Sequence, residues 1–179
     1  AIPEENVVAS EKNDGTIDTE NSNRNAPDYV ELSYQLQDRL FNEGYQIINT
    51  KSAETANLEW AEMGFDLPPV AANTIVYNVK AGDFSYSRVY LEGYNQPMSN
   101  FILRTSDIEG LTAKQIAQKY SLSKIPNRIV LVDLPRNISL EVSITGPQEA
   151  WGTLGGDIQY AIKDEDLHAA WFKNVQKLD

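Results

Sequence analysis

A glycine-containing stretch in the last third of the chain has the residue types of a small-molecule cleft. In the sequence PRNISLEVSITGPQEAWGTLGGDIQY (135–160), Trp151 precedes Gly155 and Gly156, and Gln159 begins the next strand-like run. Glycines let the backbone approach a ligand closely, and an indole ring supplies a flat wall. The stretch therefore predicts a binding cleft. The alternative is a long hairpin loop in which Trp151 belongs to the core.

An arginine between two tyrosines is the second candidate. Arg88 lies in the strand-like run SYSRVYL, two residues from Tyr86 on one side and from Tyr90 on the other. Because side chains alternate along a strand, we expect all three on one face. A guanidinium there can hold a phosphate or pyrophosphate while a phenol ring stacks on a base. The alternative is a solvent-facing arginine whose aliphatic stem packs on its neighbours.

The remaining reactive residues exclude several kinds of chemistry. The chain has no cysteine, which excludes disulfides, zinc–thiolate sites and cysteine nucleophiles. His168 is the only histidine, so a multi-histidine metal site is impossible, and we predict no metal. The carboxylates have no diagnostic pair spacing, and Asp157 is the only acid in the glycine segment. That segment is not a phosphate-binding P-loop, because it lacks the G-K-[ST] ending.

The length of the chain predicts one main domain, and its acidic charge limits the ligands that it can bind. The 179 residues carry a net charge of −11, and residues 1–31, with eight acids and two bases, account for −6 of it. Phosphate contacts need clustered Lys and Arg, so nucleic acid is a poor match, although 114–136 form a modest basic region. No apolar run is long enough for a transmembrane helix. The N-terminus lacks an initiator Met and a signal pattern, as expected of a piece of a larger or processed protein.

Two helices are expected to precede the sheet. Residues 1–27 are polar and almost free of aromatics, which predicts a linker or arm. In the segment 28–69, leucines four residues apart predict an amphipathic helix over 29–43. Ser52 is a plausible cap for a second helix over 52–63. We therefore expect 28–69 to be helical.

Residues 70–179 predict the α+β part that would hold the site. Strand-like runs occupy 74–80, 85–91, 100–104, 128–134, 138–144 and 157–163, and a turn at 81–83 joins the first two as a strand pair. Thr112 and Gln115 form a capping box that starts an inserted helix ending near 120. Residues 164–178 predict a C-terminal helix. Runs of each type indicate an α+β fold with a mostly antiparallel, twisted sheet.

Several of these runs resemble a known family. The region from about 60 to 160 includes R-V-Y at 88–90, D-I-E-G-L-T-A-K-Q-I-A-Q-K-Y-S-L at 107–122, I-P-N-R-I-V-L-V-D-L-P at 125–135 and G-P-Q-E-A-W-G-T-L-G-G-D-I-Q-Y at 146–160. It resembles the C-terminal effector domains of bacterial polymorphic toxins, such as those of contact-dependent growth inhibition. The closing W-G-x-x-G-G-x-x-Q pattern is similar to that of the tuberculosis necrotizing toxin group of NAD glycohydrolases.

The resemblance implies a function and the residues for it. Arg88 and Gln159 match the arginine and glutamine that flank the nicotinamide ribose in that group, with Trp151 as a cleft wall. It implies NAD as substrate, no cofactor, and further ligand contacts from Tyr86, Tyr90, Gly155 and Gly156. It also implies a cognate immunity protein, and secretion within a larger protein that acts in the cytoplasm of the target cell. Asp157 stands where the group usually has a glycine or another small residue.

Two other functions stay open at this point. A ribonuclease toxin that cuts transfer or ribosomal RNA would use His168, Arg88 and the lysines at 114–124 for acid–base work and phosphate contacts. A non-catalytic module, for binding or for entering cells, would leave catalysis to another part of the parent protein.

Overall fold

The N-terminal part of the fold contains two helices and one strand. A computed structural model describes residues 26–179, so most of the predicted arm at 1–27 lies outside the described residues. Asp28 and Ser52 cap the two helices by accepting the backbone amides of Glu31 and Thr55. Both predicted helices are confirmed, but the strand between them is not predicted by the sequence pattern. The elements are α2 (Tyr29–Asn42), β1 (Ile47–Ser52) and α3 (Ala53–Glu62).

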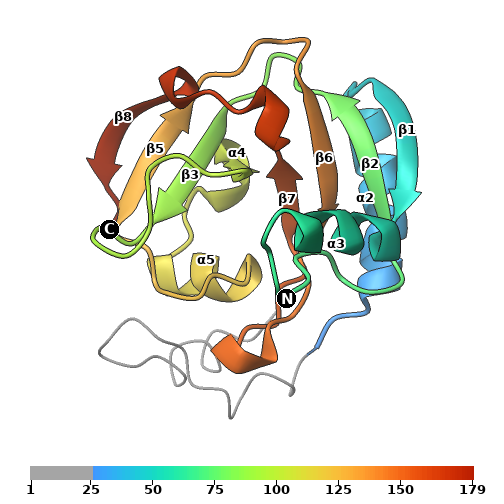
Figure 1. The fold of residues 1–179 in the computed structure, drawn as a ribbon, viewed down its shortest axis with the longest axis horizontal. Helices are drawn as coiled ribbons and strands as arrows, with labels where there is room; N and C mark the ends of the chain where they lie inside the picture. Colours follow the sequence, from blue (N-terminus) through green and yellow to red (C-terminus); the bar gives the residue numbers. More distant parts are fainter. Residues whose placement is uncertain (1–25) are drawn as a thin grey trace.

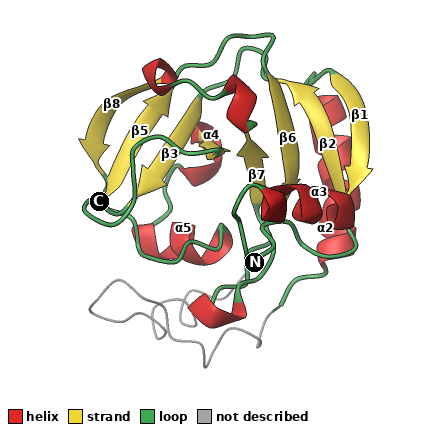
Figure 2. Cartoon of the chain, in the orientation of Figure 1, coloured by secondary structure: helices red, strands yellow, loops and turns green. Residues whose placement is uncertain are grey.

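One eight-stranded sheet organises the described residues (Figure 1, Figure 2). Its other strands are β2 (Ile75–Lys80), β3 (Tyr86–Tyr90), β4 (Phe101–Arg104), β5 (Arg128–Val132), β6 (Ser139–Ile144), β7 (Ile158–Ala161) and β8 (Phe172–Lys177). The spatial order is β1-β2-β6-β7-β4-β3-β5-β8, and every neighbouring pair is antiparallel. The α+β class and the antiparallel sheet are therefore confirmed. The sheet has two wings: β1, β2, β6 and β7 form one, β3, β5 and β8 the other, and β4 pairs with both.

The predicted strand pair at 74–91 is wrong. β2 pairs with β1 and β6, whereas β3 pairs with β4 and β5, so the turn at 81–83 connects the two wings. The short turn resembles a hairpin connection, but pairing with strands distant in sequence decides where β2 and β3 lie.

The predicted C-terminal helix over 164–178 is also wrong. Asp164–Asp166 and Ala169–Trp171 are single 3₁₀ turns, and Phe172–Lys177 is the edge strand β8, paired with β5. The apolar residues Leu167 and Trp171 are spaced as in a helix, and they pack on the main core through these turns. Asn174 has a φ of 56°, a left-handed conformation that a helix does not contain. Pairing with the open edge of β5 therefore decides the conformation of these residues, although their apolar spacing is typical of a helix.

Three apolar clusters fix the helices against the sheet. Leu36 and Leu40 of α2 pack with Val79 and Val142 on one sheet face. The inward face of α3, with Trp60 at its centre, packs on the opposite face against Val76, Val70 and Ala161. On the other wing, α4 (Thr105–Ile108) and α5 (Ala113–Lys119) cover β3 and β4. Thr112 and Gln115 form the predicted capping box at the start of α5.

Candidate functional site

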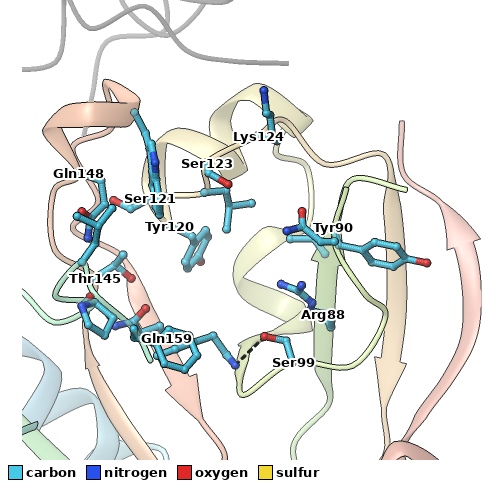
Figure 3. Close-up of a pocket in the computed structure, with 18 residues that line it drawn as sticks. Arg88, Tyr90, Ser99, Tyr120, Ser121, Ser123, Lys124, Thr145, Gln148 and Gln159 are labelled. Carbon is cyan, nitrogen blue, oxygen red and sulfur yellow. Dashed lines mark hydrogen bonds between the residues drawn. The ribbon is translucent and has the colours of Figure 1, made fainter. Parts of the chain in front are cut away.

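A cavity of about 260 Å³ lies where the two wings of the sheet meet (Figure 3). β3 and the start of β4 contribute to one side, and the end of β6 with β7 to the other. The segment that follows α5 and the 3₁₀ turn Glu149–Trp151 complete the wall. The cavity, called the Arg88 cleft below, brings together four of the predicted site residues: Arg88, Tyr90, Trp151 and Gln159.

Arg88 is a mostly buried cation with few protein partners. Its Nη2 donates to the carbonyl oxygen of Gln96 at 3.2 Å, and its Cζ lies 5.9 Å from the centroid of the Tyr90 ring. Its Nε is buried and has no hydrogen-bond partner. No carboxylate among residues 26–179 pairs with it. Loss of solvent around the guanidinium lowers the pKa of Arg88 to about 10, which leaves it charged at neutral pH.

The charge of the cleft is opposite to that of the whole protein. Among the described residues, its lining includes the cations Arg88 and Lys124 but no aspartate or glutamate. Lys124 Nζ lies 5.2 Å from the centroid of the Tyr94 ring, a cation–π contact that holds it at this site. In a chain of net charge −11, this local excess of positive charge suits a small anion.

Gln159 faces the cleft from β7. Its Nε2 donates to the carbonyl oxygen of Pro69 at 2.9 Å and to Ser143 Oγ at 3.2 Å. These bonds fix the amide and leave its Oε1 as the acceptor for a ligand. Thr145, two residues after Ser143, also lines the cleft, and its Oγ1 is buried without a hydrogen-bond partner. Figure 3 shows Gln159 and Thr145 on the opposite side of the cavity from Arg88.

Helix α5 positions the loop that carries Trp151. Gln118 Nε2 donates to the carbonyl oxygen of Gly152 at 3.1 Å, and Gln118 Oε1 accepts the amide of Leu154. Gly152 adopts a φ of 70°, which ends the 3₁₀ turn and leaves Trp151 half-buried at the cleft. Trp151 is thus a lining residue rather than part of an apolar core cluster.

Three predicted ligand contacts lie outside the Arg88 cleft. Tyr86 is fully buried in the main core, where its hydroxyl donates to the carbonyl oxygen of Ala81. Gly155 lets two backbone segments approach each other, since a Cβ there would lie 2.6 Å from the carbonyl oxygens of Thr145 and Gly146. Gly156 lines a separate cavity of about 380 Å³, with Asp157 beside it. Tyr90 lines the cleft, but Figure 3 shows its ring directed away from Gln159.

The residues of the ribonuclease hypothesis do not gather at one place. His168 is exposed and its ring packs on Trp171 at a centroid distance of 4.9 Å, outside the cleft lining. Lys124 lines the cleft, whereas Lys119 lies 4.0 Å from Asp157. An acid–base mechanism at Arg88 would therefore lack the histidine.

Several residues that line the cleft were not predicted from the sequence. Thr145 follows the alternating run 138–144 in register with Ser143, so extending the alternation by one step would have found it. The segment 120–124 also lines the cleft after α5, and of its residues only Lys124 was a sequence candidate, as a phosphate contact in the ribonuclease hypothesis. Among residues 26–179, no helix is long and apolar enough to span a membrane, and no group of three or more acidic or histidine side chains is placed to hold a metal ion.

Comparisons with known proteins find one weak structural similarity. No family model matches the chain, and no curated protein matches it significantly. Among solved structures, one similar to it is described as the structure of Tne2 in complex with Tni2. The TM-score is 0.39 and the identity 17%, over 57% of this chain and 90% of that one. A likeness this weak carries no argument about what the present chain does.

Proposed function

We propose that this chain is a toxin domain that hydrolyses NAD at the nicotinamide glycosidic bond in the Arg88 cleft. One observation carries the proposal: the partly buried guanidinium of Arg88, whose Nε is buried and unpartnered, has no carboxylate partner among the described residues and lies in a cleft whose described lining has no acid. Such a group is costly to bury unless an anion completes it. The pyrophosphate of a dinucleotide matches the charge and the planar donor geometry of Arg88.

The other cleft residues fit the remaining parts of NAD. Trp151 offers a ring face against which nicotinamide or adenine can stack. Gln159 presents Oε1, held by its bonds to Pro69 and Ser143, to the ribose or to the attacking water. The site resemblance described for Arg88 and Gln159 supports the same assignment.

The reaction needs no strong base and no cofactor. Water attacks C1′ of the ribose as the C1′–N bond breaks, and the bonding electron pair leaves with nicotinamide, which becomes neutral. The proton of the water passes to solvent. Gln159 Oε1 orients that water and faces the positive charge that develops on the ribose ring. Arg88 holds the pyrophosphate and fixes C1′ relative to Gln159.

The toxin context brings further proposals that rest on the family resemblance. The chain would be secreted within a larger protein and would act in the cytoplasm of a target cell. A cognate immunity protein would protect the producing cell.

Chelator-treated purified protein should release nicotinamide from NAD, measured by chromatography. Arg88→Ala should lower kcat/KM at least tenfold, which corresponds to about 1.4 kcal/mol of transition-state stabilisation. The matched control is Arg136→Ala, because Arg136 is an exposed arginine paired with Asp83. Intact NAD together with degraded RNA would overturn the proposal in favour of a ribonuclease. Folded Arg88→Ala protein with full activity would remove Arg88 from the site.

A further inference from the structure

A second concave surface lies next to the Arg88 cleft, between α3 and the segment that follows it. This α3 groove has a volume of about 440 Å³, and its described lining includes Leu58, Ala61 and Phe65 with Glu54 and Asp66. Leu58 is 61% exposed, so its apolar side chain is accessible to a partner at the groove.

The groove is held in shape by hydrogen bonds. Asn57 Nδ2 donates to the carbonyl oxygen of Val70 at 2.9 Å, and Asn57 Oδ1 accepts the amide of Val70 at 3.0 Å. Gln148 and Gln159 bind the carbonyl oxygens of Pro68 and Pro69 from the cleft side. The groove is therefore present without a partner, which lowers the cost of binding one.

The charged residues in the described lining of the groove, Glu54 and Asp66, are both acids. Between Lys51 and Lys80 the sequence contains acids but no lysine or arginine. Of these acids, Glu54, Glu62 and Asp66 are exposed and make no ion pair within the described residues, while Glu59 pairs with Lys51. An apolar hollow with an acidic rim favours a ligand that combines apolar and cationic groups. A second copy of this acidic chain would be repelled.

We propose that the α3 groove is a docking site for a basic protein, which inserts apolar side chains of an amphipathic helix between flanking lysines or arginines. The inserted side chains contact Leu58 and Phe65, and the flanking cations face Glu54 and Asp66. Phe65 lines both the groove and the Arg88 cleft, and Leu67 and Pro69 line the cleft. A partner seated here would lie against the shared wall at 65–70 and restrict access to the cleft. The docking site does not depend on the proposed NAD hydrolysis, because its test measures binding alone.

Two short helical peptides provide the test. Both have the same leucine stripe, and their polar positions are all lysine in one and all glutamate in the other. Fluorescence anisotropy should show the lysine peptide binding the full chain at least tenfold more tightly than the glutamate peptide. Backbone NMR shifts should fall within 54–73.

Two substitutions distinguish binding in the groove from nonspecific electrostatic binding to an acidic protein. Leu58→Asp should lower the affinity for the lysine peptide at least tenfold, although the substitution adds negative charge. Phe41→Asp is the matched control, since Phe41 is a 78% exposed apolar residue on α2. No binding, equal binding of both peptides, or equal effects of the two substitutions would overturn the proposal. Dimerisation of the chain through 54–73 in sedimentation experiments would overturn it as well.

Discussion

Arg88, the ligand-binding residue in the proposed function, opposes the stability of the folded protein. The lowered pKa of Arg88 means that burial disfavours the charged guanidinium in the folded protein. Because the folded pKa is below the unfolded value, this cost is present at all pH values below about 10 and is relieved only as pH rises through that value. At neutral pH, the free protein carries the full cost.

Arg88→Met should therefore stabilise the protein while removing its activity. Methionine fills much of the same volume without a charge, and we expect the free energy of unfolding to rise by about 1 kcal/mol, or roughly 2–4 °C in Tm. Thermal unfolding without ligand and NAD consumption measure the two effects. A large fall in Tm would show that the bond from Arg88 to Gln96 outweighs the cost of burying the charge.

Gln159 and Gln148 allow a direct contribution to catalysis to be separated from support of the cleft wall. Both donate to the 68–69 backbone, but Gln159 also lies beside Ser143 and faces Arg88 across the cleft. We expect Gln159→Ala to lower kcat at least tenfold, and Gln148→Ala to lower it less than about threefold. Steady-state kinetics with matched circular dichroism spectra will test this. Equal losses would mean that Gln159 acts only through the wall.

Asp157 stands apart from the cleft although it occupies the glycine segment. Burial raises the pKa of Asp157, while Lys119, 4.0 Å away, partly offsets the shift. The unfolded chain then loses this proton at lower pH than the folded protein, so stability falls as pH rises from about 4 through the raised folded pKa. Its side chain lines the cavity beside Gly156 and is absent from the described lining of the Arg88 cleft.

Asp157→Asn should be more stable than the parent protein at pH 7 and equal to it near pH 4, with NAD consumption retained. Urea midpoints across this pH range measure the difference. If the parent protein instead loses stability relative to Asp157→Asn as the pH falls, the ionised carboxylate is stabilising through Lys119. Loss of activity in a folded Asp157→Asn protein would place this carboxylate in the reaction.

At the scale of elements, substitutions at Asn174 test whether the C-terminal residues form the strand β8 or a helix. Asn174 lies in the register shift between β5 and β8 with a φ of 56°. Glycine adopts this conformation freely, so Asn174→Gly should leave Tm unchanged or raise it, and Asn174→Val should lower it by roughly 2–4 °C. In the helix that the sequence pattern predicts, glycine would instead cost about 1 kcal/mol relative to alanine. Thermal unfolding of the two variants distinguishes these cases.

Elements with local signals were predictable from the sequence, and their partners were not. The caps Ser52 and Thr112 mark helices that the structure contains, because a cap is a contact between residues three apart. Strand pairing depends on distant residues: Tyr86 lies opposite Arg104 and Val132, and nothing near Tyr86 encodes this choice. In the same way, Arg88, Trp151 and Gln159 could be chosen by residue type, whereas the backbone packing that requires Gly155 becomes visible only in the fold.

At the scale of the whole molecule, charge is divided between surface and cleft. The chain carries −11, yet the described cleft lining holds two cations and no acid. The long-range field of such a protein slows the approach of an anion, and only the local field at Arg88 and Lys124 favours it. Salt screens exposed charges over about 10 Å at 0.1 M, so the repulsive part should weaken first as ionic strength rises.

Removal of residues 1–25 tests this balance. The segment contains six acids and two bases, so its removal changes the net charge from −11 to −7. A chain that begins at Ala26 keeps the Asp28 cap of α2 and Pro27, which lies next to Gly156. We expect its Tm to stay within about 2 °C of the parent and its KM for NAD to be equal or lower at low salt, with the difference vanishing above about 0.15 M. A chain that begins at Tyr29 is the contrasting variant, since loss of the cap should cost about 1 kcal/mol. A marked loss of stability or activity in the Ala26 variant would show that residues 1–25 pack on the domain and are not a linker.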